Sequence, residues 1–447
     1  MEHKNLITVP FQRVLSNGVL MKKGNSNQYE FKPTLGLLDA LSISIGAIIG
    51  AGIFIVVGIT AKVAGSALVV SMLLAAIIAV FTALSFAELT AWQPREGSIY
   101  EYTYQLISPF AGFLTGWMWI VSNTFAGAAV SLGFASYLAA LFPLLPVNWV
   151  AAVLCISFTI INFLGVRQTA MLNNILVATK LLILAFFVVY GLLYFNAANL
   201  TPFAPLNLGV FYGAFYIFFA YGGFARVAVV AEEVKDAKHN VPKAILLSLA
   251  ISTIVYVLVG FVAVGLIGAD ELAKSSSPLT DAISMTNNMF ARYFVAAGGL
   301  LATASVLLSA ILGVSRMTYA MARRRDLPEA FYRLHPKFNT PHYSIWIVGL
   351  LMVLLVLLAD LDKVVAISTF ALLFYYTLAN ICAIRVNTLE RSYPRIIPVL
   401  GAYTCLALLV FAFLTSPESW ITGIICLAIG ALYYSVKQKF FKQERKR

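Results

Sequence analysis

The chain has 447 residues, of which 61% are hydrophobic and only 11% are charged, and its mean hydropathy is +0.87. A typical soluble domain is about 45–50% apolar and about 25% charged, so this chain has too few charged side chains to cover a soluble surface. These values exclude soluble secreted enzymes, coiled coils and disordered chains. The apolar runs are continuous over about 20 residues, whereas the strands of a membrane β-barrel alternate over about ten. A helical membrane protein is therefore expected.

Apolar stretches of about 17–25 residues, each long enough to cross a bilayer, follow one another along almost the whole sequence. The first 32 residues are polar and mildly basic, and no cleavable signal peptide is expected there. We predict an all-α integral membrane protein with twelve transmembrane helices, the third of them one long helix or a helix with a bent amphipathic start. The predicted spans are 36–62, 66–90, 99–140, 146–164, 171–195, 208–234, 242–267, 290–321, 343–359, 362–384, 396–415 and 419–436.

The first and sixth spans each carry a glycine cluster, GAIIGAGIF at 46–54 and FAYGGF at 219–224. Unwound backbone is tolerated at this depth only where it is buried in protein or lines a cavity. Because the clusters lie five spans apart, they predict two broken helices at equivalent places of an inverted repeat, which is typical of secondary transporters. Close helix packing through the GxxxG pattern of Gly46 and Gly50 is the alternative explanation of the first cluster.

Broken helices also predict a class of substrate. Free backbone N–H groups at the start of a half-helix attract a carboxylate, and free carbonyl groups at the end of one attract an ammonium group. A zwitterionic amino acid carries both groups. The two glycine clusters therefore favour an amino acid as the substrate.

Lys180 lies well inside the fifth span, in the sequence LVATKLLILAFF. A charged lysine at such a depth costs about 3 kcal/mol unless it is paired or hydrated, so Lys180 is a candidate proton carrier that couples transport. The alternative is a structural tether whose amine reaches back to the cytoplasmic end of the span. The histidines offer no other relay within the spans, because all of them lie in the predicted tail or loops: His3, His239, His335 and His342.

Arg226 follows the second glycine cluster and has two interpretations. It contacts an acidic substrate, or it pairs with a carboxylate at the inner gate. The candidate gate carboxylates end the second and sixth spans: Glu88, Glu232 and Glu233. Their expected ion-pair partners are Arg95, Lys235 or the amphipathic loop. No carboxylate lies beside the breaks at mid-membrane depth, which disfavours a cationic substrate.

Several motifs occur in a set order along the chain: IIGAGIF in the first span, PREGSIYEY after the second, AYGGFARVAVVAEEV in the sixth with a basic stretch containing Pro242 behind it, and SRMTYAMARRRDLPEAF after the eighth. With them, about residues 33 to 436 resemble the amino acid–polyamine–organocation (APC) superfamily. The resemblance implies a LeuT-like fold, with a 5+5 inverted repeat followed by two C-terminal helices. It also implies sodium-independent amino acid transport that is often proton-coupled.

The resemblance further assigns roles to individual residues. The substrate carboxylate would meet four residues of the first span: Ile49, Gly50, Ala51 and Gly52. Carbonyl groups and an aromatic lid would come from the sixth span: Phe219, Ala220, Tyr221 and Gly222. Lys180 would occupy the place that sodium takes in sodium-coupled relatives, near the first-span carbonyls. Ala225 stands where members often have an acidic or polar residue, so an acid-sensing role is not expected at that position.

The distribution of charge sets the expected orientation. With the N-terminus inside, 25 of the 31 Lys and Arg residues lie on the inner side and four on the outer side, so both termini are expected in the cytoplasm of a multi-pass cell-membrane protein. The expected segments are a cytoplasmic N-terminal tail (1–34), the first repeat (35–195), the second repeat (208–384), the last two spans (396–436) and a basic cytoplasmic tail (437–447). The net charge of +12 follows from this topology and from anionic lipid, and no nucleic-acid partner is expected.

The predicted function is secondary active import of amino acids by alternating access, sodium-independent and proton-coupled as in a symporter. Neutral side chains of small to medium size are expected, because the candidate lining is small or apolar: Ala47, Ala51, Gly127, Phe219, Tyr221, Phe224, Ser305 and Ser309. An amino acid exchanger, and a carrier of acidic or cationic amino acids or amines, remain open as alternatives. Which amino acid is carried and how the chain oligomerises are not determined by the sequence.

Two other classes of function are disfavoured. A channel would need a wide pore lined by a ring of like groups, which an asymmetric pair of breaks does not supply. An enzyme would need a catalytic motif, and the chain contains no GxSxG, HExxH or phosphate-binding loop. The four cysteines lie in apolar runs without CxxC spacing, so no disulfide framework, metal site or cofactor is expected.

Overall fold

The computed structural model describes residues 33–50, 52–95, 97–142, 144–387, 391–415 and 417–444, all within one compact unit, Phe31–Arg447. Ala51 and most of the predicted N-terminal tail lie outside these residues. Over the described ranges the regular structure is helical, and the only strand-like pairing is an isolated parallel bridge between Leu35 and Val234. The all-α prediction is thus confirmed for the part of the chain that the structure describes.

Each predicted span contains a helix. The first five spans correspond to α1 (Leu37–Ile48), α2 (Val57–Ala64), α3 (Leu68–Trp92), α4 (Ile99–Leu106), α5 (Pro109–Leu141), α6 (Val147–Leu164) and α7 (Val166–Leu192). The other seven correspond to α8 (Leu208–Tyr221), α9 (Arg226–Val229), α10 (Ala237–Ile267), α13 (Met289–Arg323), α14 (His342–Leu358), α15 (Leu361–Arg385), α16 (Ile396–Thr415) and α17 (Pro417–Glu444). Two short helices, α11 (Ala269–Lys274) and α12 (Pro278–Ser284), connect α10 to α13.

Local sequence explains where the long central helices begin. Ser108 is extended, and its hydroxyl accepts a hydrogen bond from the Ala111 N–H at 3.2 Å, with Pro109 in the first turn of α5. The predicted span 99–140 is therefore two helices, α4 and α5, which is the bent form of that prediction. Asn288 caps α13 in the same way through the Ala291 N–H at 3.2 Å.

The apolar helices fit a multi-pass membrane protein. Nine stretches of the described chain are long and apolar enough to cross a membrane, and two shorter apolar helices accompany them, His342–Leu358 and Ile396–Phe411. Large apolar side chains also face outward, among them Leu182 and Val189 of α7, which are 70% and 68% exposed. Such a surface is stable against lipid rather than against water.

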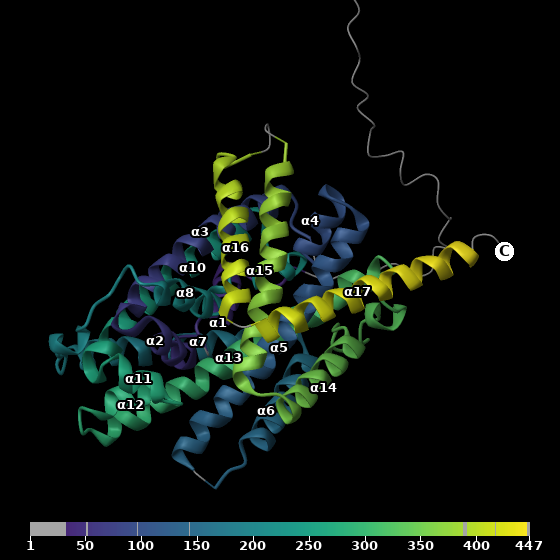
Figure 1. Ribbon diagram of the computed structural model, residues 1–447. Coiled ribbons are helices and arrows are strands. Elements are labelled where there is room, and N and C mark those ends of the chain that lie inside the picture. The colour runs from purple at the N-terminus through teal and green to yellow at the C-terminus, as the bar shows by residue number, and fades with distance from the viewer. Residues whose placement is uncertain are drawn as a thin grey trace, which may run out of the picture. The chain divides into compact units, whose positions relative to one another are not determined.

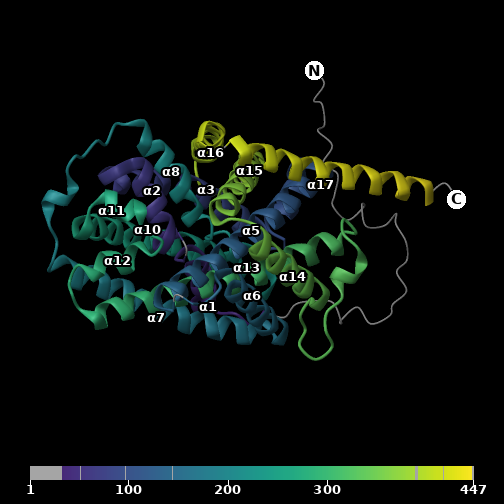
Figure 2. The same cartoon turned by 60° about the horizontal axis from the view of Figure 1, so that its bottom comes forward.

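Helices α5 and α13 lie at the centre of the bundle, where α13 packs against α5 and α7 and α15 packs against α5 (Figure 1). α15 also packs along α16. Helix α17 packs on α5 and then continues away from the bundle in both views (Figures 1 and 2). It runs to Glu444, beyond the predicted end of the last span at 436, so the first eight residues of the predicted basic tail are helical.

Candidate functional site

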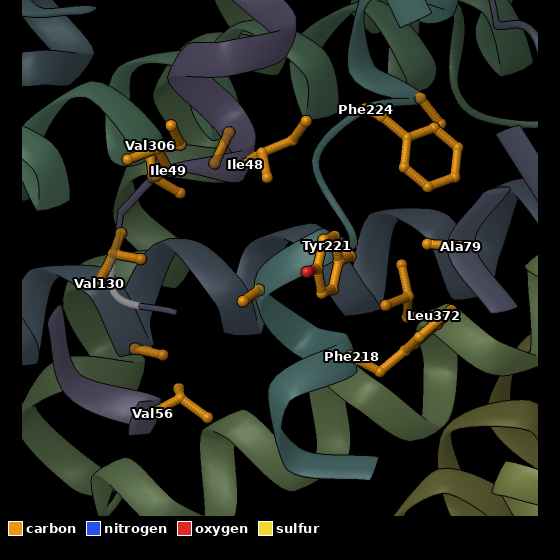
Figure 3. Close-up of a cluster of buried hydrophobic side chains, with 14 of the residues drawn as sticks. Ile48, Ile49, Val56, Ala79, Val130, Phe218, Tyr221, Phe224, Val306 and Leu372 are labelled. Carbon is orange, nitrogen blue, oxygen red and sulfur yellow. The ribbon is translucent and has the colours of Figure 1, made fainter. Parts of the chain in front are cut away.

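Both glycine clusters interrupt their helices, as predicted. α1 ends at Ile48, the next residue, Ile49, is extended with φ of −77° and ψ of 101°, and a π-helical turn is formed by Gly52–Val56. α8 ends at Tyr221, and α9 begins at Arg226 after a turn. Figure 3 shows the apolar side chains around these interruptions, including Ile48 and Ile49 of the first break and Phe218 and Tyr221 on α8.

The two breaks touch each other through glycines. A Cβ atom on Gly223 would lie 2.2 Å from the carbonyl carbon of Ala47 and 2.5 Å from the nitrogen of Ile48. A Cβ atom on Gly52 would lie 2.1 Å from the Cβ of Ala220. Only glycine permits so close an approach. Gly46 and Gly50 are closely packed as well, since an added Cβ atom would lie 2.5 Å from the Asn173 Oδ1 on the first and 2.1 Å from the Val306 Cγ2 on the second. Close packing and a broken helix therefore both apply to the first cluster.

A cavity lies between the two breaks. Its walls come from α1 and the π-helical turn, from α5, from the α8–α9 segment, and from α13 and α15: Ala47, Ile48, Gly52, Ser122, Asn123, Ala126, Val130, Phe219, Ala220, Gly222, Gly223, Arg226, Val306, Ser368 and Leu372. None of these residues is acidic. Five of the predicted site residues are among them: Gly52, Phe219, Ala220, Gly222 and Arg226.

Other predicted site residues lie behind the cavity wall. Gly50 packs against Val306, because a Cβ atom there would lie 2.1 Å from the Cγ2 of Val306. Tyr221 is fully buried, packs edge-to-face on Tyr256, and its hydroxyl donates to the Met72 carbonyl at 3.3 Å. Ile49 turns its carbonyl toward Lys180. Ala51 is outside the described residues.

Lys180 is completely buried on α7 and holds the first break together. Its Nζ lies within hydrogen-bond distance of four acceptors, which share its three N–H donors: the carbonyls of Gly46 at 3.2 Å, Ile45 at 3.4 Å and Ile49, and the Ser305 Oγ of α13 at 2.6 Å. The amine therefore points into the bundle and not back along α7 to a helix end. This is the placement that the resemblance implies, although it leaves the coupling role a prediction.

Arg226 is also buried, with 5% of its surface exposed, and its partners differ from those predicted. Its Nε donates to the Asn123 Oδ1 at 2.9 Å, and its Nη1 donates to the Val306 carbonyl at 3.1 Å and to the Ser309 Oγ at 2.9 Å. The predicted pairing of Arg226 with a gate carboxylate is wrong, since the predicted carboxylates face other arginines: Arg391, Arg323 and Arg316.

Three buried tyrosines, which the sequence-based prediction missed, hold carbonyls of the breaks. Tyr256 donates to the Ile48 carbonyl at 2.6 Å and to the Ala220 carbonyl at 3.2 Å. Tyr376 donates to the Gly222 carbonyl at 2.8 Å, and Tyr137 donates to the Phe54 carbonyl at 2.5 Å. A buried tyrosine hydroxyl needs a hydrogen-bond partner, so tyrosines inside predicted spans could have identified these contacts.

An ion-pair cluster closes one end of the bundle, where α1 begins and α9 ends. Glu233 pairs with Arg316 at 2.9 Å in a fully buried contact, and Glu232 pairs with Arg323 at 2.9 Å. Both arginines belong to α13, so the predicted partners Arg95 and Lys235 are wrong. The backbone is tied here too, because the Glu233 carbonyl accepts from the Leu35 N–H at 2.9 Å.

Further charged groups extend this cluster. Glu88 lies 4.0 Å from the Nε of Arg391, and both side chains are buried. Asp326, which follows α13, accepts from the Tyr100 hydroxyl at 2.8 Å and from the Lys437 Nζ of α17 at 2.9 Å. The α1, α4, α9, α13 and α17 segments are thus joined at one end of the bundle. No group of His, Cys, Asp and Glu residues in the described ranges is suited to hold a metal ion.

Removing the charge of Glu233 should destabilise the protein strongly. The Glu233→Gln change leaves the Arg316 cation buried without its carboxylate, which typically costs about 3–5 kcal/mol. We expect a large fall in the melting temperature of the purified protein, and a smaller fall when Arg316→Met is added.

The exposed pair of Lys274 and Glu271 provides the control for this experiment. Its side chains are 72% and 64% exposed, so Glu271→Gln should leave the melting temperature unchanged. An equally stable Glu233→Gln protein would show that the buried pair does not hold this end of the bundle closed.

The chain is similar in sequence to known transporters. The family described as "Amino acid permease" matches residues 35–434. An uncharacterised transporter of Mycobacterium tuberculosis is 34% identical, covering 93% of this chain and 94% of its own. A branched-chain amino acid permease of Bacillus subtilis is 31% identical, covering 92% and 94%. Cationic amino acid transporter 4 of the mouse is 30% identical, covering 85% of this chain and 63% of its own.

Proposed function

Because the chain belongs to the amino acid permease family, we propose that it is a secondary active transporter that imports amino acids by alternating access. The observation that carries the proposal is the cavity whose walls include both broken helices. Membership of a permease family also makes this protein a transporter and not an enzyme. The substrate is a small molecule, and the protein is embedded in a membrane.

We also propose the full membrane architecture. The first apolar stretch, Leu37–Trp92, is 56 residues long, whereas one crossing takes about 20, so it supplies two spans. With the two shorter apolar helices, the nine stretches then make twelve spans in a LeuT-like 5+5 repeat followed by α16 and α17. The repeats are 35–195 and 208–384. The bias of Lys and Arg supports a cell-membrane location with both termini cytoplasmic.

The amino acid would bind by its zwitterionic part at the two breaks. The carboxylate of the substrate would approach the glycine-rich segment after α1, and the ammonium group of the substrate would face carbonyls at the end of α8. Tyr256 and Tyr376 fix carbonyls at these breaks, so the binding geometry is set before the substrate arrives.

Lys180 supports sodium-independent, proton-coupled transport. Its amine occupies the carbonyl-lined position beside the first break, where a bound cation would otherwise sit. Lys180 contacts the Ser305 hydroxyl of α13, and Arg226, a second buried cation, contacts the Ser309 hydroxyl one helical turn further along α13. Loss and gain of a proton at Lys180 would then alter how tightly α1 is held against α7 and α13 as the protein changes conformation.

Counterflow in proteoliposomes tests transport itself. A carrier exchanges internal unlabelled substrate for external labelled substrate, a channel equilibrates the two without such stimulation, and an enzyme alters the molecule. We expect counterflow that needs no sodium. The second candidate function is an amino acid exchanger. Counterflow without net pH-driven uptake would favour the exchanger over the symporter.

Amino acids with a cationic side chain, and polyamines, should not be substrates. The cavity already carries the Arg226 cation, Lys180 lies close behind it, and no lining residue is acidic. Besides Arg226, the lining is neutral and includes three polar side chains, Ser122, Asn123 and Ser368, so the cavity offers no partner to a cationic side chain. The sequence-based expectation of small to medium neutral side chains stays a prediction. A thermal-shift screen of the twenty amino acids and putrescine checks this, because a ligand at 100 times its Kd adds about 2.7 kcal/mol of stability. Saturable uptake of arginine or a polyamine, with no response to other amino acids, would contradict it.

A further inference from the structure

We propose that Arg226 binds an anionic group at the end of the substrate's side chain, so that the site selects acidic amino acids. The inference rests on the proposed amino acid transport and narrows its substrate class. It departs from the sequence-based preference for neutral side chains, and the reason is the observed environment of Arg226.

A count of hydrogen-bond donors shows that the Nη2 group of Arg226 has no acceptor among the described residues. A guanidinium group has five N–H donors. The Nε donor binds Asn123, and the two Nη1 donors face the Val306 carbonyl and the Ser309 hydroxyl. No acceptor among the described residues takes the two donors of Nη2. Because Arg226 lines the cavity, a ligand that binds in the cavity can accept hydrogen bonds from these two Nη2 donors.

The charge of Arg226 is also unbalanced. Its three protein partners are an amide, a carbonyl and a hydroxyl, all of them neutral. An arginine stays protonated in proteins, and a buried cation is costly unless an anion pairs with it. The carboxylates that were predicted to pair with it face other arginines.

A second buried cation increases the demand for an anion. Lys180 contacts Ser305, and Arg226 contacts Ser309, so both cations meet hydroxyls of α13 that are one helical turn apart. Neither cation forms an ion pair among the described residues. A zwitterionic substrate brings no net charge to these cations, whereas an acidic amino acid brings one negative charge.

The cavity offers groups for both ends of such a substrate. Gly52 of the first break and Gly222 of the second line the same cavity as Arg226. The zwitterionic part can therefore bind at the breaks while the side-chain carboxylate reaches Nη2. Asn123 also lines the cavity and holds the guanidinium group from the side of α5. Charge-assisted hydrogen bonds of this kind are about twice as strong as neutral ones.

The test compares ligands that differ only in charge. Apparent Kd values for glutamate, glutamine, aspartate and asparagine are measured by thermal shift on the purified full-length protein, and the substrates are then checked by counterflow. We expect glutamate or aspartate to bind about 10- to 100-fold more tightly than the corresponding amide.

Two variants assign this preference to Arg226. The Arg226→Gln change removes the charge and should lower the acid-to-amide ratio by about 10- to 100-fold. The Asn123→Asp change keeps the arginine but supplies a carboxylate at the position now 2.9 Å from Nε. The Asn123→Asp variant should also abolish the preference for the acid over the amide, because its carboxylate would pair with Arg226. It tests the inference even if the Arg226→Gln protein fails to fold. Ser284→Ala, on α12 and outside the cavity lining, is the control that should keep the ratio.

The outcomes separate this inference from the proposed function. Binding of neutral amino acids with no response to glutamate or aspartate would overturn the inference and leave amino acid transport standing. An acid preference that survives in the folded variants would overturn the role of Arg226. A protein that binds no amino acid at all would overturn the proposed function and this inference together.

Discussion

Proteoliposomes that contain the Lys180→Gln protein should fail to concentrate the substrate when a pH gradient drives uptake, with accumulation falling to the level of empty liposomes. The glutamine amide can still donate to the carbonyls that now face Nζ, among them Gly46 and Ile49, but it cannot carry a proton. Substrate binding should persist, because the proposed carboxylate and ammonium contacts are made by the backbone. Wild-type uptake should increase as the external pH falls and should not require sodium.

Further variants sharpen this test. Lys180→Ala should abolish accumulation and also lower stability, because it leaves buried carbonyls without a donor. Lys180→Arg should keep the positive charge permanently and slow turnover. Lys62→Ala is the matched control, since Lys62 is exposed at the end of α2. The coupling role is excluded if uptake depends on sodium at fixed pH, or if the Lys180→Gln protein still concentrates substrate from a pH gradient.

Substitution of Gly223 or Gly52 should abolish substrate binding. A Cβ atom on Gly223 would lie 2.2 Å from the backbone of Ala47, and one on Gly52 would lie 2.1 Å from Ala220. Backbone cannot move aside as a flexible side chain can, so even alanine must push the two breaks apart and open the site. Gly52→Val and Gly50→Val add a β-branched side chain and should be at least as damaging. Radioligand binding and counterflow measure the loss.

Gly260 of α10 provides the matched control for these variants. Its added Cβ would meet the ends of Met72 and Leu68, at 2.7 Å and 3.2 Å, and these side chains can shift. Gly260→Ala should therefore keep binding and transport, and alanine also favours the helix. Normal transport by both the Gly223→Ala and Gly52→Ala proteins would show that close contact of the breaks is not needed for the site.

The sequence by itself determined the helical membrane class, the positions of the apolar helices and the two interruptions. These features depend on local composition: the length of apolar runs sets the spans, and glycine clusters mark places where a helix is weak. The start of α5 is local too, since Ser108 and Pro109 define it. Lys180 could be identified as unusual because a charge inside an apolar run is costly wherever its partners lie.

Only the tertiary structure decided which groups meet. Lys180 and Ile45 are 135 positions apart, Arg226 and Ser309 are 83 apart, and Tyr256 and Ile48 are 208 apart. Local sequence patterns do not predict contacts between residues so far apart. The partners predicted from the sequence for the gate carboxylates and for Arg226 were therefore wrong. Gate carboxylates were expected to pair with nearby loops, but α13 brings Arg316 and Arg323 to them instead. The neutral partners of Arg226, on which the acidic-substrate inference depends, follow from how α5, α9 and α13 pack together.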